Sequence, residues 1–185
     1  MLPIVETTAA PPAADKRRHR QVRWQEARAV AAQTLGEVTV HYDATLGEVA
    51  EAGARWSRVA HAAGWGVGTR IHALGDGAPW LAQQASVCFG TCSTYLLDLY
   101  HVCDYLAAVW PGDKTTVQAH RDALKAGRHE QVFTALRDRL EAPELPDEQA
   151  PARCALRYLE NRREQLDYPG ALAAGLPVGS GLIES

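Results

Sequence analysis

The sequence predicts an α/β fold in which a sheet is flanked by helices. Three observations carry this prediction. β-like runs are concentrated in the first hundred residues, and helical periodicity dominates from about residue 101 to residue 163. In addition, apolar runs lead through tight turns into helices, as in the strand–turn–helix units of α/β proteins. The chain has 185 residues, of which 46% are hydrophobic and 22% charged, so it is large enough and apolar enough to form a folded core.

The first predicted elements precede residue 64. Residues 21–32 and 38–42 contain β-branched and aromatic side chains and are expected to be strands. A helix is expected after Thr45, because apolar residues follow at helical spacing up to Ala60. Gly64 and Gly66 are expected to end that helix.

Two apolar runs then define the centre of the predicted sheet. Arg70–Leu74 is expected to be a buried strand ending in a Gly-Asp-Gly turn. Pro79 is suited to begin a helix, which is expected to run to about Phe89. Thr94–Leu99 is the next strand. Because one helix separates the two runs, we expect adjacent parallel strands joined by a right-handed crossover.

The second half of the chain is predicted to be mostly helical. Leucine and valine recur at helical spacing from His101 to Arg163. Breaks are expected at Pro111-Gly112 and between Pro143 and Pro151.

The charge distribution is mildly acidic overall and basic only locally. The formal net charge is -3, whereas freestanding DNA-binding domains usually carry a basic excess. The best candidates for phosphate contacts are Lys16, Arg17, Arg18, Arg20 and Arg23. The alternative is that this run is a solvated strand or loop edge.

The remaining composition argues against membrane insertion and secretion. No apolar run approaches the ~18 residues that a membrane-spanning helix needs, and the N-terminus does not resemble a secretory signal. The four cysteines do not form a paired framework, so a reduced, cytoplasmic setting is expected. Cys88 and Cys92 with His101 or Cys103 have poor spacing for a zinc site.

Three positions are candidates for metal-dependent chemistry. Asp76 follows a predicted buried strand, at the edge where α/β folds usually bind ligands, although an ordinary turn residue or helix cap would look the same. Asp98 and His101 are spaced for a carboxylate–imidazole contact, and their alternative is a helix cap with a half-buried histidine. Glu184 follows Gly-Ser-Gly near the C-terminus and by itself means little. Together, such carboxylates could hold Mg²⁺ ions for phosphoryl transfer.

Three segments, taken in order, resemble bacterial DDE insertion-sequence transposases of the IS-Kra-four group. They are Leu74-Gly-Asp-Gly-Ala-Pro-Trp80, Leu97-Asp-Leu-Tyr-His101 and Leu176-Pro-Val-Gly-Ser-Gly-Leu-Ile-Glu-Ser185. The resemblance covers essentially the whole chain, and the last ten residues are its most specific part. It implies an RNase H-like fold, in which helices flank a mixed sheet and a helical insertion precedes the last catalytic residue.

The resemblance also implies roles for individual residues. Asp76 matches the second catalytic Asp and Glu184 the closing Glu, so both are expected to bind Mg²⁺ or Mn²⁺. Asp98 and His101 match an Asp-x-x-His signature that supports the active site. Residues 1–101 would be a partial catalytic core, 102–170 the helical insertion and 171–185 the start of the helix that carries the Glu.

The family's first catalytic Asp has no counterpart in this sequence. In the family it stands in an Asp-Gly pair, followed within a few residues by a segment like Met1–Val5. The sequence therefore predicts a fragment, cut at both ends, of an enzyme that cleaves and joins DNA, and the fragment is expected to be inactive alone. Its expected partner is DNA, and a second copy of the chain or full-length transposase is a further candidate partner. The alternatives are a non-catalytic remnant that binds DNA or full-length transposase and, less favoured, an unrelated small metal-dependent hydrolase.

Overall fold

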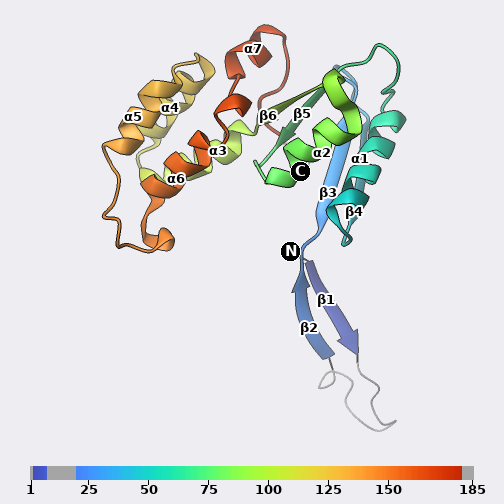
Figure 1. Cartoon of the computed structure of the whole chain (residues 1–185), viewed down its shortest axis with the longest axis horizontal. Helices are drawn as coiled ribbons and strands as arrows, with labels where there is room; N and C mark the ends of the chain where they lie inside the picture. Colours follow the sequence, from blue (N-terminus) through green and yellow to red (C-terminus); the bar gives the residue numbers. More distant parts are fainter. Residues whose placement is uncertain (1, 8–19, 181–185) are drawn as a thin grey trace. The chain divides into compact units, whose positions relative to one another are not determined.

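The computed structural model describes residues 2–7 and 20–180, and these form two compact units that divide between Gly64 and Trp65 (Figure 1). Each unit contains both helix and strand. The described strands form three separate two-stranded sheets. The predicted α/β class is thus confirmed, whereas the RNase H-like arrangement remains a prediction.

The first unit contains two antiparallel hairpins and one helix. Strand β1 (Leu2–Thr7) pairs with β2 (Arg20–Gln25), and β3 (Arg28–Gln33) pairs with β4 (Val40–Thr45). The sequence predicted one strand over residues 21–32, which is wrong. The strand partner changes from β1 to β4 at residues 26–27, and this interrupts the β structure.

Helix α1 (Val49–Ala62) packs against β3 and β4. Its buried face includes Ala52, Trp56, Val59 and Ala60, at the spacing that places residues on one side of a helix. On its polar side, Arg55 bridges the carboxylates of Asp43 in β4 and Glu51, each at 2.7 Å. The hydrogen bond from Arg55 lowers the pKa of the Asp43 carboxyl.

The second unit begins with a strand–helix–strand unit. Strand β5 (Ile71–Gly75) is followed by α2 (Pro79–Phe89), the short 3-10 helix η2 (Gly90–Cys92) and β6 (Ser93–Leu97). β5 and β6 are parallel neighbours, with Ile71 opposite Ser93 and Gly75 opposite Leu97. The predicted parallel pair and the predicted helix start at Pro79 are both confirmed.

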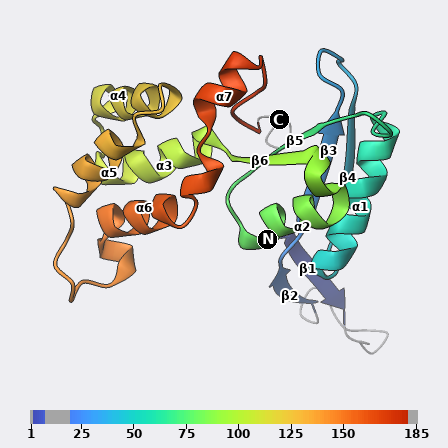
Figure 2. The ribbon, with the colours of Figure 1, turned by 45° about the horizontal axis from the view of Figure 1, so that its top comes forward.

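The rest of the second unit is helical (Figure 2). The helices are α3 (Leu99–Val109), α4 (Lys114–Lys125), α5 (His129–Arg137), α6 (Pro151–Glu160) and α7 (Tyr168–Ala173), with short 3-10 helices η3 (Asp147–Gln149) and η4 (Arg163–Gln165). Both predicted breaks are confirmed. A further break separates α4 from α5, where Gly127 has φ +73°, a conformation that favours glycine.

One hydrophobic core joins the strands of the second unit to its helices. Leu96 and Leu97 of β6 belong to the same buried cluster as Leu106 of α3, Leu124 of α4 and Leu159 of α6. The helical part is therefore packed directly on the sheet that carries Asp76. The division at residues 101 and 170 follows from the family resemblance alone and stays a prediction.

Candidate functional site

Asp76 and Asp98 lie side by side at the carboxyl edge of the parallel strands. Each directly follows a member of the paired residues Gly75 and Leu97, and the backbone N–H of Asp98 donates to the carbonyl of Gly75 at 2.8 Å. The Asp76 side chain is exposed, and its Oδ1 accepts the N–H of Ala78 at 2.9 Å. Among the described residues its Oδ2 has no partner. Asp76 is thus both a turn-forming residue and a carboxylate with an oxygen available to a cation.

The Asp76–Gly77 turn is held by the end of α6 and the residues after it. The hydroxyl of Tyr158 donates to the carbonyl of Asp76 at 2.5 Å, and Nε of Arg162 donates to the carbonyl of Gly77 at 2.7 Å. Nothing in the sequence marked Tyr158 or Arg162, because they lie more than eighty residues away and belong to no motif. They are functional candidates that only the structure reveals.

Tyr95 is a second tyrosine near this turn. A Cβ atom added to Gly75 would lie 2.6 Å from the Tyr95 hydroxyl oxygen, so the phenol packs directly against the strand end. Burial raises the pKa of Tyr95 to about 12. The phenol therefore stays neutral at physiological pH.

Asp98 is buried and its carboxylate is occupied on both oxygens. Oδ1 caps helix α3 by accepting the N–H groups of Tyr100 at 2.7 Å and His101 at 3.3 Å. Oδ2 accepts the backbone N–H of Ser180 at 2.6 Å, and it also accepts the Ser180 hydroxyl. The helix-cap interpretation of Asp98 therefore holds, and the same carboxylate also fixes a distant segment of the chain.

The segment from Pro177 to Ser180 is attached at several points. The carbonyl of Val178 accepts the N–H of Leu99 at 2.9 Å, and the carbonyl of Pro177 lies 2.9 Å from Nε2 of His72 in β5. Gly179 lies against the Tyr100 ring, since an added Cβ would be 2.3 Å from two ring carbons. Two of the segments that carry the family resemblance are thus packed together. Glu184, four residues further on, lies outside the described residues.

The imidazole of His101 packs among aromatic rings. Its ring is edge-on to Tyr105 at 5.7 Å and to Tyr158 at 6.0 Å, and these two tyrosines stack at 4.1 Å. The contact between Asp98 and His101 is made through the His101 backbone N–H, and no hydrogen bond joins the carboxylate to the imidazole. His101 therefore connects the start of α3 to the tyrosine that holds the Asp76 turn.

The fit of a divalent cation rests on Asp76. Within residues 2–7 and 20–180, no group of three or more His, Cys, Asp or Glu side chains is arranged to hold a metal ion. Asp76 nevertheless offers a carboxylate oxygen of the kind that Mg²⁺ and Mn²⁺ prefer.

The predicted phosphate contacts are placed only in part. Lys16, Arg17 and Arg18 lie outside the described residues, and Arg20 and Arg23 belong to strand β2.

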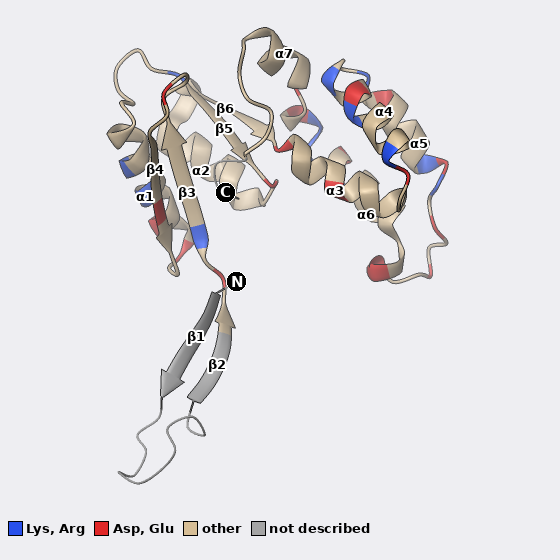
Figure 3. Cartoon of the chain, turned by 180° about the vertical axis from the view of Figure 1, so that it is seen from behind, with Lys and Arg blue, Asp and Glu red and all other residues tan. Residues whose placement is uncertain are grey.

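Elsewhere basic and acidic residues are mixed, as Figure 3 shows for helices α4 and α5. Arg137 and Arg163 pair with Glu160 and Glu130, which ties α5 to α6 and to the residues that follow it.

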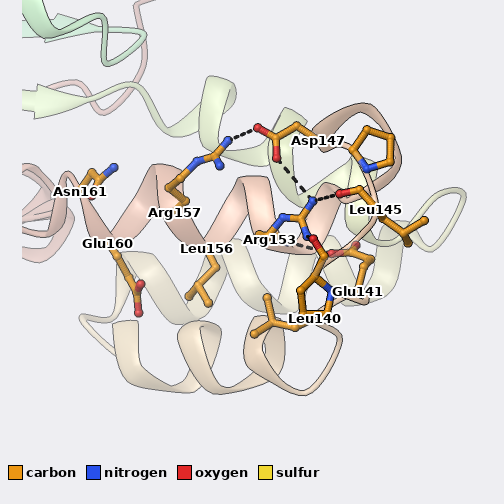
Figure 4. A pocket seen from close by; sticks show the side chains of 11 residues that line it. Leu140, Glu141, Leu145, Asp147, Arg153, Leu156, Arg157, Glu160 and Asn161 are labelled. Carbon is orange, nitrogen blue, oxygen red and sulfur yellow. Dashed lines mark hydrogen bonds and ion pairs between the residues drawn. The ribbon is translucent and has the colours of Figure 1, made fainter.

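A separate pocket of about 640 Å³ lies between α6 and the loop that precedes it (Figure 4). Asp147 pairs there with Arg153 at 3.5 Å and Arg157 at 2.6 Å. Burial alone would raise the pKa of Glu141, but N–H groups donated by Ala152 and Arg153 hold it below its ordinary value. Asp147 and Glu141 thus have partners within this pocket, Glu160 pairs with Arg137 outside it, and none of the predicted site residues lines it.

Comparison with known proteins finds no matching family model, no similar curated protein and no similar solved structure. The helices in the described part of the chain include none with the length and apolar character needed to cross a membrane.

Proposed function

We propose that this chain supplies Asp76 and Glu184 to the active site of a DDE transposase, which cleaves and joins DNA strands with Mg²⁺ or Mn²⁺. One observation carries the proposal. The strand end that leads into Asp76 and the segment that leads to Glu184 are both hydrogen bonded to Asp98, although about one hundred residues separate them in sequence.

The reach of the chain supports this pairing. Ser180 is bound to Asp98, whose backbone is bound to the residue before Asp76. Glu184 follows Ser180 by four residues, and a fully extended chain covers at most about 3.6 Å per residue, or about 14 Å in total. We infer that this length is enough for Glu184 to approach the Asp76 carboxylate, because Ser180 is already bound to Asp98.

The candidate residues would have different roles in the reaction. Asp76 and Glu184 would hold the cation, with the first Asp of the family as a third ligand. Bound Mg²⁺ would act as a Lewis acid that activates the attacking oxygen and stabilises the leaving oxygen of a phosphodiester. Asp98 would keep the Glu184 segment at the site, and its own oxygens, already occupied by four donors, are not needed as ligands.

A strand-cleavage assay tests the proposal. The chain is extended upstream by a segment with the family's Asp-Gly pair and downstream by the residues that follow the Glu in the family. It is then incubated with DNA from the flanks of its coding region and Mg²⁺ or Mn²⁺. Cleavage should be lost in Asp76→Asn and Glu184→Gln and retained in Asp113→Asn, an exposed helix-cap aspartate. Cleavage that persists in Asp76→Asn would refute the assignment. DNA binding without cleavage in every variant would instead favour a non-catalytic DNA-binding chain.

A further inference from the structure

The turn that carries Asp76 is held by Tyr158, near the end of α6, and by Arg162, just after it. Both side chains bind backbone carbonyls of the turn. Tyr158 and Arg162 donate to two successive carbonyls, those of Asp76 and Gly77, at 2.5 and 2.7 Å. Neither residue hydrogen bonds to the Asp76 carboxylate. The two peptide units that follow Asp76, on either side of Gly77, are therefore fixed, while one Asp76 carboxylate oxygen has no partner among the described residues.

The two donors are themselves held in place. The Arg162 guanidinium lies over the Tyr158 ring at 4.3 Å, and its Nη1 donates to the Tyr158 carbonyl at 3.0 Å. The other face of that ring stacks on Tyr105 at 4.1 Å. Burial raises the pKa of Tyr158, so its hydroxyl stays protonated and continues to donate. The pair thus forms a preorganised support rather than a surface contact.

Gly77 is shaped to accept this support. Its φ is +82°, which glycine adopts readily. A Cβ atom at this position would lie 2.5 Å from Nε of Arg162 and 2.7 Å from Cδ1 of Leu97. The glycine therefore allows both the turn and the close approach of the guanidinium.

We propose that Tyr158 and Arg162 are positioning residues that hold the Asp76 carboxylate ready for a divalent cation. The helical segment after β6 is then part of the metal site, because it fixes the backbone from which the ligand projects. Groups that orient metal ligands typically contribute about 10- to 100-fold to metal affinity. This inference rests on the proposed function of Asp76.

The test is a titration of the 185-residue chain with Mn²⁺, which broadens NMR signals close to the bound ion. Apparent affinity is read from the amide signals of Gly75 and Gly77, and Asp76→Asn defines the loss of the site. Tyr158→Phe removes only the hydroxyl, and about tenfold weaker Mn²⁺ binding is expected. Its matched control is Tyr168→Phe, because the buried Tyr168 hydroxyl has no hydrogen-bond partner among the described residues.

For Arg162→Gln, the electrostatic and the positioning explanations predict opposite changes in Mn²⁺ affinity. Loss of a positive charge beside the turn would strengthen cation binding by Coulomb's law. Loss of positioning would weaken it, and we expect about tenfold weaker binding, partly restored in Arg162→Lys. Arg163→Gln is the control, because Arg163 pairs with Glu130 instead.

The outcomes separate the inference from the function on which it rests. Broadening in the wild type that Asp76→Asn does not remove would refute the proposed function, and the inference with it. If Mn²⁺ binding depends on Asp76, but Tyr158→Phe and Arg162→Gln bind Mn²⁺ as tightly as their control variants, only the positioning role is refuted. If Tyr158→Phe loses its fold by circular dichroism, the Arg162 variants decide the question.

Discussion

Asp98 offers the sharpest structural test, because one buried carboxylate joins the start of α3 to the segment before Glu184. Replacing Asp98 by Ala removes a helix cap, which contributes about 1 kcal/mol. It also removes two hydrogen bonds from Ser180 to a charged acceptor, each about 1.5 kcal/mol at the lower end of its range. The expected loss is about 4 kcal/mol in total. Asp98→Asn can keep the cap but places an amide opposite the Ser180 donors, so about 3 kcal/mol should be lost.

The assay is amide hydrogen exchange at Leu99 and Ser180, because these N–H groups are bound within the attachment itself. A loss of about 3 kcal/mol corresponds to roughly a hundredfold faster exchange, at 1.4 kcal/mol per tenfold. Ser180→Ala should have a smaller effect and should be non-additive with Asp98→Asn, since both remove the same contact. Asp113→Ala, which removes a helix cap in α4, should leave both amides unchanged. Wild-type protection at Ser180 in Asp98→Asn would refute the attachment.

Three further predictions concern activity, pH and backbone conformation. The purified chain should not cleave or join DNA with Mg²⁺ or Mn²⁺, because two ions about 4 Å apart need more carboxylates than Asp76 and Glu184 provide; activity that disappears in Asp76→Ala would contradict this. Burial lowers the pKa of His120 in the folded chain. Below about pH 6.5 the unfolded chain therefore binds more protons than the folded chain. The free energy of unfolding should fall as the pH decreases from there, by at most about 1.4 kcal/mol per pH unit. Denaturation midpoints of His120→Gln between pH 7.5 and 5 should show less of this fall, and an unchanged pH dependence would contradict the assignment. Gly77→Ala should lower the free energy of unfolding by about 2 kcal/mol or more. The control, Gly112→Ala, should lower it by about 1 kcal/mol, because Gly112 has a similar φ but open surroundings. Equal denaturation midpoints of the two variants would show that the contact with Arg162 is not tight.

The sequence by itself determined the local elements around Asp76. Two apolar runs separated by one helix length predicted the parallel strands, and Pro79 marked the start of the helix between them. These features are readable because each depends on residues close together in the chain: the apolar pattern of a strand, the fixed φ of proline and the freedom of glycine. The sequence also has an Asp near the end of each apolar run, and the proximity of Asp76 and Asp98 then follows from the parallel register.

Local patterns failed where the partner of a segment decides its structure. The division of residues 20–33 into β2 and β3 depends on which strand pairs with each half. The side-chain pattern along one segment does not carry that information. The missed break at Gly127 has a similar cause, because a single glycine within a helical pattern can be either tolerated or used as a stop.

Only the tertiary structure decided how the candidate site is held together. Asp98 meets Ser180 and Tyr158 meets Asp76 across 82 residues in each case, and Arg162 meets Gly77 across 85. Such contacts exist because the shared core places α3, α6 and the end of β6 against one another. Their donors and acceptors are ordinary residues whose partners are fixed by packing, so the sequence could name the carboxylates but not the groups that position them.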